Sequence, residues 1–375
     1  MMNEDSFFEA LETQYAKELP FVVYSRPINS IIKCWLQKDA VLHTTDSFTE
    51  SGFVFAPFNF NEQRILLPET ECEHYSFKVD SKLESNSAQK SKPFHLNETG
   101  RLSHINLVSK GIETIKNTEL KKVVLSRCET QTIKDTNPIS IFKRLYNTYK
   151  NAMVYCWYHP KVGLWIGATP ELLFKVEGKQ LTTISLAGTQ AYNSESEVTW
   201  TTKEFEEQQI VTDYITEQIE PYTKRINISE VETIRAGNLL HLKSRITSLI
   251  DPSANLKSII EALHPTPAVC GFPKQVAKDF ILENENYDRA FYTGFLGELN
   301  LKQSKTRNTN RRNVENNAYA VVKTQSNFYV NLRCMQLQEA KALIYVGGGI
   351  TKDSNPEKEW EETVNKTKTI GSILD

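Results

Sequence analysis

One lysine and four glutamates have the types and spacing that metal-assisted chemistry on an anionic small molecule requires. Lys122 is the second lysine of KKVVLSR, an apolar segment typical of a β-strand. Glu204 and Glu207 are three residues apart in one predicted helix, and Glu359 and Glu362 have the same spacing in another. Helical residues three apart lie on nearly the same face, so each couple presents two carboxylates together. Two oxygen-only couples suit Mg²⁺, which keeps several waters and takes few direct carboxylate ligands.

Lys122 is a candidate general base. Alternation along residues 120–127 places it on one face of a strand with Val124 and Ser126. Apolar neighbours take water away from the amine and lower its pKa toward the range of a general base. The alternative is an ordinary lysine at the edge of a sheet.

Glu171 is a candidate general acid. It follows a proline turn in GATPELL (167–173) and enters an apolar strand. A buried carboxylic acid with a raised pKa can donate a proton to a leaving oxygen. The alternative is a turn glutamate that stays in water.

The helix predicted over residues 197–220 places Glu207 on a stripe with Ile210, Val211 and Tyr214. A carboxylate on an apolar stripe is costly unless it is paired or bound to a metal. Glu207 is therefore expected to have a functional partner.

The C-terminal helix predicted over residues 356–371 aligns Glu359, Glu362 and Lys366 at positions i, i+3 and i+7. The alternative interpretation of Glu362 and Lys366 is an ordinary surface pair four residues apart. Glycines of VGGGI (346–350) and LAGT (186–189) would let backbone N–H groups approach an anionic ligand. Arg333, predicted on a strand, could hold a carboxylate with its guanidinium fork.

Composition narrows the class of protein. The chain has 375 residues, 39% of them hydrophobic, and a net charge of −2, so it shows no overall attraction to nucleic acid. Six scattered cysteines without a CxxC pair suit a reducing cytosol. The N-terminus is acidic, unlike a secretory signal, and no run of about 18 apolar residues predicts a membrane span.

Strands and helices intermix without regular βαβ alternation, which predicts an α+β fold with antiparallel sheets. Short strands are expected within residues 20–37, 52–57 and 63–67. Residues 80–97 are polar and rich in serine and lysine, as in a linker. The segment 302–313 is basic and rich in asparagine, and it is expected at the tip of a hairpin.

Nine segments, taken in order, resemble the chorismate-utilising enzyme family. They are KVVLSR, GATPEL, LAGT, KEFEE, LHPTPAV, YTGFLG, LRC, GGGI and SNPEKEWEET. The resemblance implies a single chorismate-binding domain over residues 1–375, with a variable N-terminal sheet portion (1–98) and a catalytic core (99–375). It implies two stacked antiparallel sheets with helices packed outside, as in anthranilate synthase component I.

The same resemblance implies a role for each site residue. Glu207 and Glu362 would ligate Mg²⁺ directly, and Glu204 and Glu359 would act through waters. Lys122 would be the base and Glu171 the acid. The substrate pocket would be lined by Gly188, Thr189, His241, Ala268, Tyr292, Arg333, Gly349 and Lys366. Two positions depart from the family pattern, because Gln190 replaces a frequent arginine and Gln208 replaces the histidine that usually follows the metal-binding glutamate.

Three positions favour the isochorismate synthase branch. Lys122 is typical of members that use water, whereas anthranilate synthases carry an uncharged residue there. Ala187 replaces the lysine nucleophile of aminodeoxychorismate synthases. Ala268, in HPTPAV (264–269), is similar to isochorismate synthases, whereas salicylate synthases typically carry threonine. A salicylate synthase, which goes on to eliminate pyruvate, remains the alternative enzyme, and a non-catalytic protein that binds through the 302–313 loop is the alternative of another class.

The implied reaction is a reversible isomerisation of chorismate. Lys122 deprotonates water, the water attacks ring carbon C2, and Glu171 protonates the C4 hydroxyl as it leaves. No ammonia is consumed, so no glutamine amidotransferase subunit is expected, and neither is a nucleic-acid or membrane partner. We expect a cytoplasmic monomer. Menaquinone and siderophore pathways both consume isochorismate, and Tyr292 in place of phenylalanine favours menaquinone.

Overall fold

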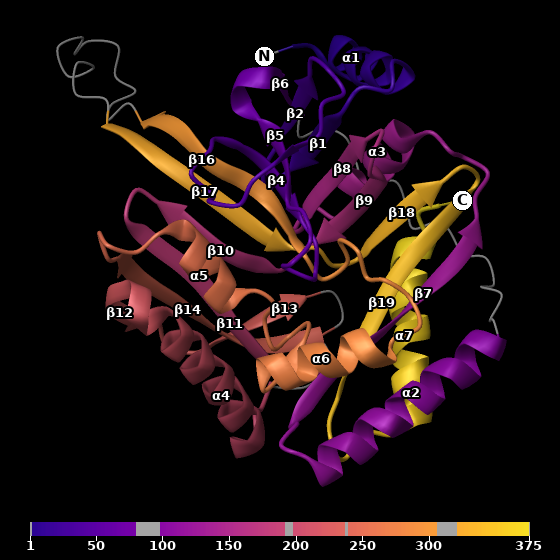
Figure 1. The fold of residues 1–375 in the computed structure, drawn as a ribbon, viewed down its shortest axis with the longest axis vertical. Helices are drawn as coiled ribbons and strands as arrows, with labels where there is room; N and C mark the ends of the chain where they lie inside the picture. Colours follow the sequence, from indigo (N-terminus) through magenta and orange to yellow (C-terminus); the bar gives the residue numbers. More distant parts are fainter. Residues whose placement is uncertain (1, 80–97, 192–197, 237–238, 306–320, 375) are drawn as a thin grey trace.

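A computed structural model describes residues 2–79, 98–191, 198–236, 239–305 and 321–374. Their strands form two large antiparallel sheets (Figure 1). The first sheet runs in the order β15 (Gly271–Phe272), β7 (Lys122–Thr132), β19 (Lys341–Ile350), β18 (Cys334–Gln338), β9 (Gly163–Thr169), β8 (Met153–His159), β1 (Phe21–Ser25), β2 (Ile31–Gln37) and β6 (Cys72–Lys78).

The second sheet contains strands that lie between residues 43 and 330 of the chain. It runs in the order β12 (Thr223–Ile228), β14 (Leu239–Ile250), β11 (Gln180–Ala191), β10 (Leu172–Glu177), β17 (Val321–Val330), β16 (Phe295–Lys305), β4 (Gly52–Ala56), β5 (Ile65–Pro68) and β3 (His43–Thr44), with β13 (Glu232–Ala236) beside β14. The N-terminal strands thus extend both sheets.

Seven helices of the described residues pack around these sheets. They are α1 (Glu4–Ala16), α2 (Glu98–Asn117), α3 (Pro138–Thr148), α4 (Thr202–Ile219), α5 (Leu256–Leu263), α6 (Lys274–Asn284) and α7 (Pro356–Gly371). In Figure 1, α4 and α5 cover the second sheet at the lower left, and α2 and α7 cover the first sheet at the lower right. None of these helices combines the length and apolarity that crossing a bilayer requires.

Aromatic side chains fill the space between the two sheets. Phe55 of the second sheet contacts Trp157 and Trp165 of the first, at ring-centroid distances of 4.7 and 5.9 Å. Separate apolar clusters lie under the outer helices, one beneath α1 and α3 and another beneath α4 and α5. Burial of apolar surface on both faces of each sheet is what stacks the layers.

The expected α+β architecture of two stacked antiparallel sheets is confirmed. Sequence patterns missed β6 and β12, because their exposed residues outnumber the buried ones and give weak alternation. The predicted linker 80–97 and residues 306–313 of the predicted hairpin tip lie outside the described residues.

Strand β7 is the element on which the site is built. It pairs with β19 from Val123 to Thr132, and its first residues, Lys122 and Val123, pair with the short β15 on the other side. Helix α7 begins at Pro356, where the Asn355 side chain accepts hydrogen bonds from the amides of Glu357 and Lys358. A capping asparagine before a first-turn proline fixes where this helix starts, and hence where its carboxylates lie.

His104, a buried imidazole on α2, should make stability depend on pH. Its ring lies 6.0 Å from that of Trp360 on α7, and no described residue hydrogen-bonds to either ring nitrogen. Burial, assisted by the Arg127 charge, lowers its pKa from 6.5 to about 4. At pH values between these two pKa values, His104 therefore binds a proton in the unfolded chain but not in the folded protein. We expect this residue to remove about 2 kcal/mol of unfolding free energy between about pH 7 and pH 5.

Urea unfolding at the two pH values measures this effect. His104→Leu should remove that part of the pH dependence, because leucine fills the site without titrating. An unchanged difference between the two pH values in the variant would contradict the assignment.

Candidate active site

Lys122, the first residue of β7, extends its side chain over a glycine of the neighbouring strand. A Cβ added to Gly349 would lie 3.0 Å from Lys122 Cε and 3.6 Å from Nζ, so glycine leaves the room that the lysine occupies. Burial lowers the pKa of Lys122, and the Lys366 charge acts in the same direction, whereas Glu207 and Glu171 act in the opposite one. The amine therefore lies within electrostatic range of residues from three other segments.

Glu171 lies immediately before β10. It is distant from Lys122 in the sequence but within electrostatic range of it in the structure. Burial raises the pKa of its carboxyl to about 7, although the charges of Lys122 and Arg333 favour the ionised form. Its backbone is fixed by a hydrogen bond from the Val330 amide to the Glu171 carbonyl, at 3.0 Å. A carboxyl with this pKa is protonated in a large fraction of molecules near neutral pH.

Arg333 was predicted on a strand, and this prediction is wrong. Strand β17 ends at Val330, and Arg333 forms the bend before β18 with a positive φ of 48°. This left-handed backbone breaks the extended run. The side chain is exposed, and its charge reaches the carboxyl of Glu171 and the hydroxyl of Tyr149.

Helix α7 brings Glu359 and Glu362 together above β19. A Cβ added to Gly348 would lie 3.2 Å from Glu359 Oε2 and 3.8 Å from Glu362 Oε1. Burial raises the pKa of Glu359, and the nearby Glu362 charge raises it further. Gly348 and Gly349 are consecutive, so they would carry side chains on opposite faces. The Glu359 and Glu362 carboxylates and the Lys122 amine therefore approach opposite faces of the glycine segment of β19.

Lys366 completes the α7 side of the site. Its Nζ lies 2.6 Å from Glu362 Oε1 and donates to the Gly347 carbonyl at 2.8 Å. The predicted ion pair between Glu362 and Lys366 is therefore present, and Lys366 also contacts β19 at Gly347. Beneath the helix, Arg127 of β7 donates to the hydroxyls of Thr363 and Thr367, which fixes the helix on the sheet.

Helix α4 presents its glutamates differently from the sequence prediction. Glu207 is exposed and Ile210 is 67% exposed, so the predicted apolar stripe through these two residues is wrong. The buried face instead follows the residues Gln208, Thr212, Ile215 and Ile219. The sheet beneath the first half of α4 offers serine hydroxyls, so the helix meets it with polar side chains that hydrophobic periodicity cannot detect.

Glu204 lies in the first turn of α4 and forms a capping box with Thr201. Its carboxylate accepts a hydrogen bond from the Thr201 amide at 2.9 Å and another from the Thr201 hydroxyl. A Cβ added to Gly188 would lie 3.3 Å from Glu204 Cβ, so this glycine permits the close approach of helix and strand.

A bulge in β11 places the LAGT segment against His241. Gly188 has a φ of 69°, and the register with β14 shifts between Ala187 and Thr189. The Nδ1 atom of His241 lies 3.1 Å from the Gly188 carbonyl, and Thr189 is paired with His241 across the strands. The side chain of Thr189 lies outside what the structure describes.

The four glutamates lie on two helices, α4 and α7, rather than in one assembled set of ligands. Among the described side chains, no three His, Cys, Asp or Glu residues are close enough together to hold one ion. The donors are nevertheless all oxygens, and Gly348 leaves a cradle beside Glu359 and Glu362 that a Cβ would fill. Hard divalent cations such as Mg²⁺ prefer such donors, so the residues fit this metal.

Tyr292 is buried beside Gly347, the first of the three consecutive glycines of β19. Its hydroxyl lies 3.1 Å from where a Cβ of Gly347 would be, and its ring stacks on Tyr345 at 5.5 Å. Burial raises its pKa, and the Glu171 charge contributes to the increase. Tyr292 therefore shares a neighbourhood with Glu171, whereas Ala268 lies exposed in the turn that precedes β15.

The sequence did not predict a buried ion pair that connects β7 to the segments on either side of α6. Arg289 donates to both oxygens of Glu285, at 2.7 and 2.6 Å, and both side chains are 2% exposed. The same guanidinium donates to the carbonyls of Val124 and Val269. Ser126 donates to Glu285 through its amide and its hydroxyl, each at 2.8 Å. Spacing of four residues was the only sequence signal for this pair.

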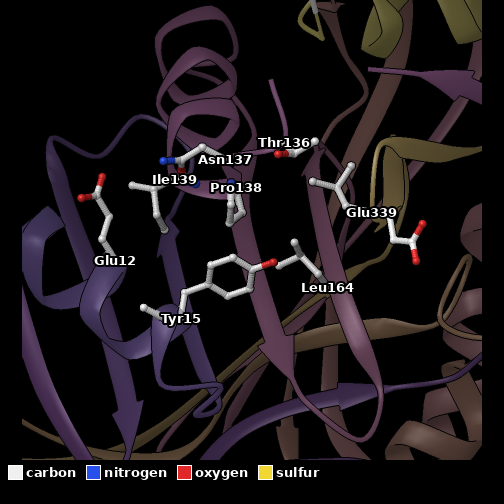
Figure 2. Close-up of a pocket in the computed structure, with 10 residues that line it drawn as sticks. Glu12, Tyr15, Thr136, Asn137, Pro138, Ile139, Leu164 and Glu339 are labelled. Carbon is white, nitrogen blue, oxygen red and sulfur yellow. Dashed lines mark hydrogen bonds between the residues drawn. The ribbon is translucent and has the colours of Figure 1, made fainter. Parts of the chain in front are cut away.

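A separate surface cavity of about 460 Å³ lies away from these residues. It is lined by residues of α1, the start of α3 and the strands β9 and β18 (Figure 2). Tyr15 points into its centre, and Glu12 and Glu339 lie at opposite ends. None of the predicted site residues lines it.

Comparison with known proteins identifies the family. A model of the chorismate binding enzyme family matches residues 22–305, and a second model with the same description matches residues 318–372. Isochorismate synthase MenF of Pasteurella multocida is 30% identical over 71% of this chain and 60% of its own length. Isochorismate synthase DhbC of Bacillus subtilis is 29% identical over 55% of this chain and 49% of its own length. The chain thus spans about half to three fifths of these curated relatives.

Solved structures agree on the fold. The structure of MenF, the menaquinone-specific isochorismate synthase from Escherichia coli, superposes with a TM-score of 0.74 at 20% identity, covering 95% of this chain and 89% of that one. Anthranilate synthase component I from Streptococcus pneumoniae gives a TM-score of 0.64 at 16% identity, covering 94% and 90%. The matched models span most of the sequence, so the chain belongs to the chorismate binding enzyme family.

Proposed function

We propose that this chain is a Mg²⁺-dependent isochorismate synthase, which isomerises chorismate by adding water at C2 and removing the C4 hydroxyl. The observation that carries the proposal is the complementary tuning of two neighbouring groups. The pKa of Lys122 is lowered and that of Glu171 is raised to about 7, in each case chiefly by burial. Groups pushed toward their neutral forms in this way provide a base and an acid at the same pH. Matching relatives named isochorismate synthases support the same reaction.

The two residues divide the proton transfers between them. Neutral Lys122 accepts a proton from water as the water oxygen bonds to C2. The two ring double bonds shift, the C4–O bond breaks, and Glu171 gives its proton to the departing hydroxyl, which leaves as water. The ammonium and carboxylate then return to their starting states by net transfer of one proton. One water enters and one leaves, so no ammonia and no amidotransferase subunit are needed.

The remaining residues bind and orient the substrate. Glu204, Glu207, Glu359 and Glu362 would hold Mg²⁺, which supplies positive charge to the ring carboxylate of chorismate. Tyr292 and Arg333 would bind the pyruvyl carboxylate, and both lie within electrostatic range of Glu171. Gly188, Thr189, His241, Ala268, Gly349 and Lys366 would line the rest of the pocket. All six cysteines are free thiols, which suits a cytoplasmic enzyme.

Product analysis tests this function. Chorismate incubated with the protein and Mg²⁺ should give isochorismate, separated by liquid chromatography, at a rate that added ammonium does not change. Salicylate and pyruvate as the main products would replace the proposal with a salicylate synthase. Anthranilate formation with ammonium would contradict the water reaction itself.

Gly348→Ala should weaken Mg²⁺ binding with little loss of stability. The added methyl group would lie 3.2 Å from Glu359 Oε2, and a flexible carboxylate can move away from it at small cost. Displacing one proposed ligand should raise the Mg²⁺ concentration for half-maximal activity by about 10-fold. Thermal unfolding and a Mg²⁺ titration of the activity check both parts. A wild-type Mg²⁺ requirement in the variant would contradict the position of Glu359 in the site.

A further inference from the structure

The first half of α4 is held on its sheet by a buried amide. Gln208 is 1% exposed, and its Nε2 lies 2.9 Å from the hydroxyl of Ser244, 3.0 Å from that of Thr212 and 3.1 Å from that of Ser185, so its two N–H groups are shared among three acceptors. Ser185 and Ser244 are paired across β11 and β14, so one amide spans two strands. Ser185 and Thr212 are themselves 2.8 Å apart. These groups form a closed polar cluster between helix and sheet.

Apolar packing begins only at the end of this half of the helix, where the half-buried Val211 packs against the cluster beneath α4. Phe205 and Ile210 on its outer side are 45% and 67% exposed. The buried isoleucines, Ile215 and Ile219, lie two to three turns further along. Apolar contacts tolerate small rotations, whereas a hydrogen-bonded amide fixes both rotation and translation because its geometry is directional.

The proposed metal-binding glutamates of α4 lie next to this amide. Glu207 is the preceding residue, and Glu204 is one turn earlier on the side of Gly188. A rotation of the helix about its axis would change the position of the Glu207 carboxylate relative to Lys122, and that of the Glu204 side chain relative to Gly188. The residue that fixes this rotation therefore controls where the carboxylates point.

We propose that Gln208 is a positioning residue, whose hydrogen bonds to Ser185, Thr212 and Ser244 set the rotation of α4 that aims Glu204 and Glu207 at the metal. The inference rests on the proposed function, because it assigns Gln208 to the Mg²⁺ site of that reaction. Gln208 touches neither metal nor substrate in this role. It acts through the backbone of α4.

Gln208→Met is the direct test, because methionine keeps the length of the side chain and removes its donors. Gln14→Met is the matched control: Gln14 is also a buried helical glutamine, and its Nε2 donates to the carbonyls of Pro20 and Gln37. Mg²⁺ affinity is measured by isothermal titration calorimetry. Hydrogen exchange of the backbone amides of residues 205–212 reports how firmly α4 packs on the sheet. Ser244→Ala, which removes one acceptor, provides a second and milder variant.

We expect Gln208→Met to raise the Kd for Mg²⁺ by about 10- to 100-fold and to speed exchange in residues 205–212. Ser244→Ala should shift both quantities in the same direction by less, and Gln14→Met should shift neither. Unchanged affinity and exchange in Gln208→Met, or in Ser244→Ala if the first variant does not fold, would overturn the inference.

The same experiment separates this inference from the reaction. Wild-type protein that binds Mg²⁺ without converting chorismate would remove the proposed reaction and leave the role of Gln208 standing. Wild-type protein that binds no Mg²⁺ would overturn the positioning role together with the metal site.

Discussion

Lys122→Ala is expected to lower kcat by about 10²- to 10⁴-fold, the range that a positioned general base contributes. Without the amine, no described group beside Gly349 takes the proton from the attacking water. Mg²⁺ affinity should not fall, because the carboxylate couples stay in place and lose a competing positive charge. Steady-state rates at saturating chorismate and Mg²⁺, with calorimetry of Mg²⁺ binding, measure the two effects separately.

The neighbouring Lys121 provides the matched control. It is exposed and precedes β7, so Lys121→Ala should keep wild-type turnover. Near-normal activity in Lys122→Ala, or an equal loss in both variants, would remove Lys122 as the base.

Glu171→Gln is expected to lower kcat by a similar factor, because an amide cannot protonate the leaving hydroxyl. The pH profile gives a more specific result. In the wild type, kcat/KM should fall toward low pH as Lys122 gains a proton, and toward high pH as Glu171 loses one. One of the two breaks should lie near the Glu171 pKa of about 7. In Glu171→Gln, the decline at high pH should disappear, and the residual rate should rise with pH to a plateau.

Glu177→Gln is the control for this variant, because Glu177 ends the same strand β10 in an ion pair with Lys175. It should leave the pH profile unchanged. A decline at high pH that persists in Glu171→Gln would assign the proton donor to another group.

Local patterns in the sequence predicted most elements correctly. Helix α7 was predicted over the residues that it occupies, since Pro356 and the preceding asparagine mark its start. Alternation and apolar runs located β7, β8 and β14. Strands β6 and β12 were missed because a strand with mostly exposed residues carries no strong alternation, and only pairing with a neighbour makes it a strand.

Some features of the site could be predicted from the sequence, and the orientation of helix α4 could not. The pKa shifts of Lys122 and Glu171 follow from burial, which the apolar residues around them in the sequence predicted. The orientation of α4 could not be predicted, because its buried face carries Gln208 and Thr212, which resemble surface residues in sequence. The Glu285–Arg289 pair was missed for the same reason, since charges four residues apart usually mark an exposed helix.

Isotope labelling tests whether the enzyme removes the C4 hydroxyl and adds a new hydroxyl from water at C2, as the roles of Lys122 and Glu171 require. The reaction is run in H₂¹⁸O with Mg²⁺ and stopped early, and the isochorismate is analysed by mass spectrometry. We expect one ¹⁸O atom per product molecule, in the new C2 hydroxyl. Product that carries no ¹⁸O would contradict it, because the original hydroxyl would then have migrated without attack by water.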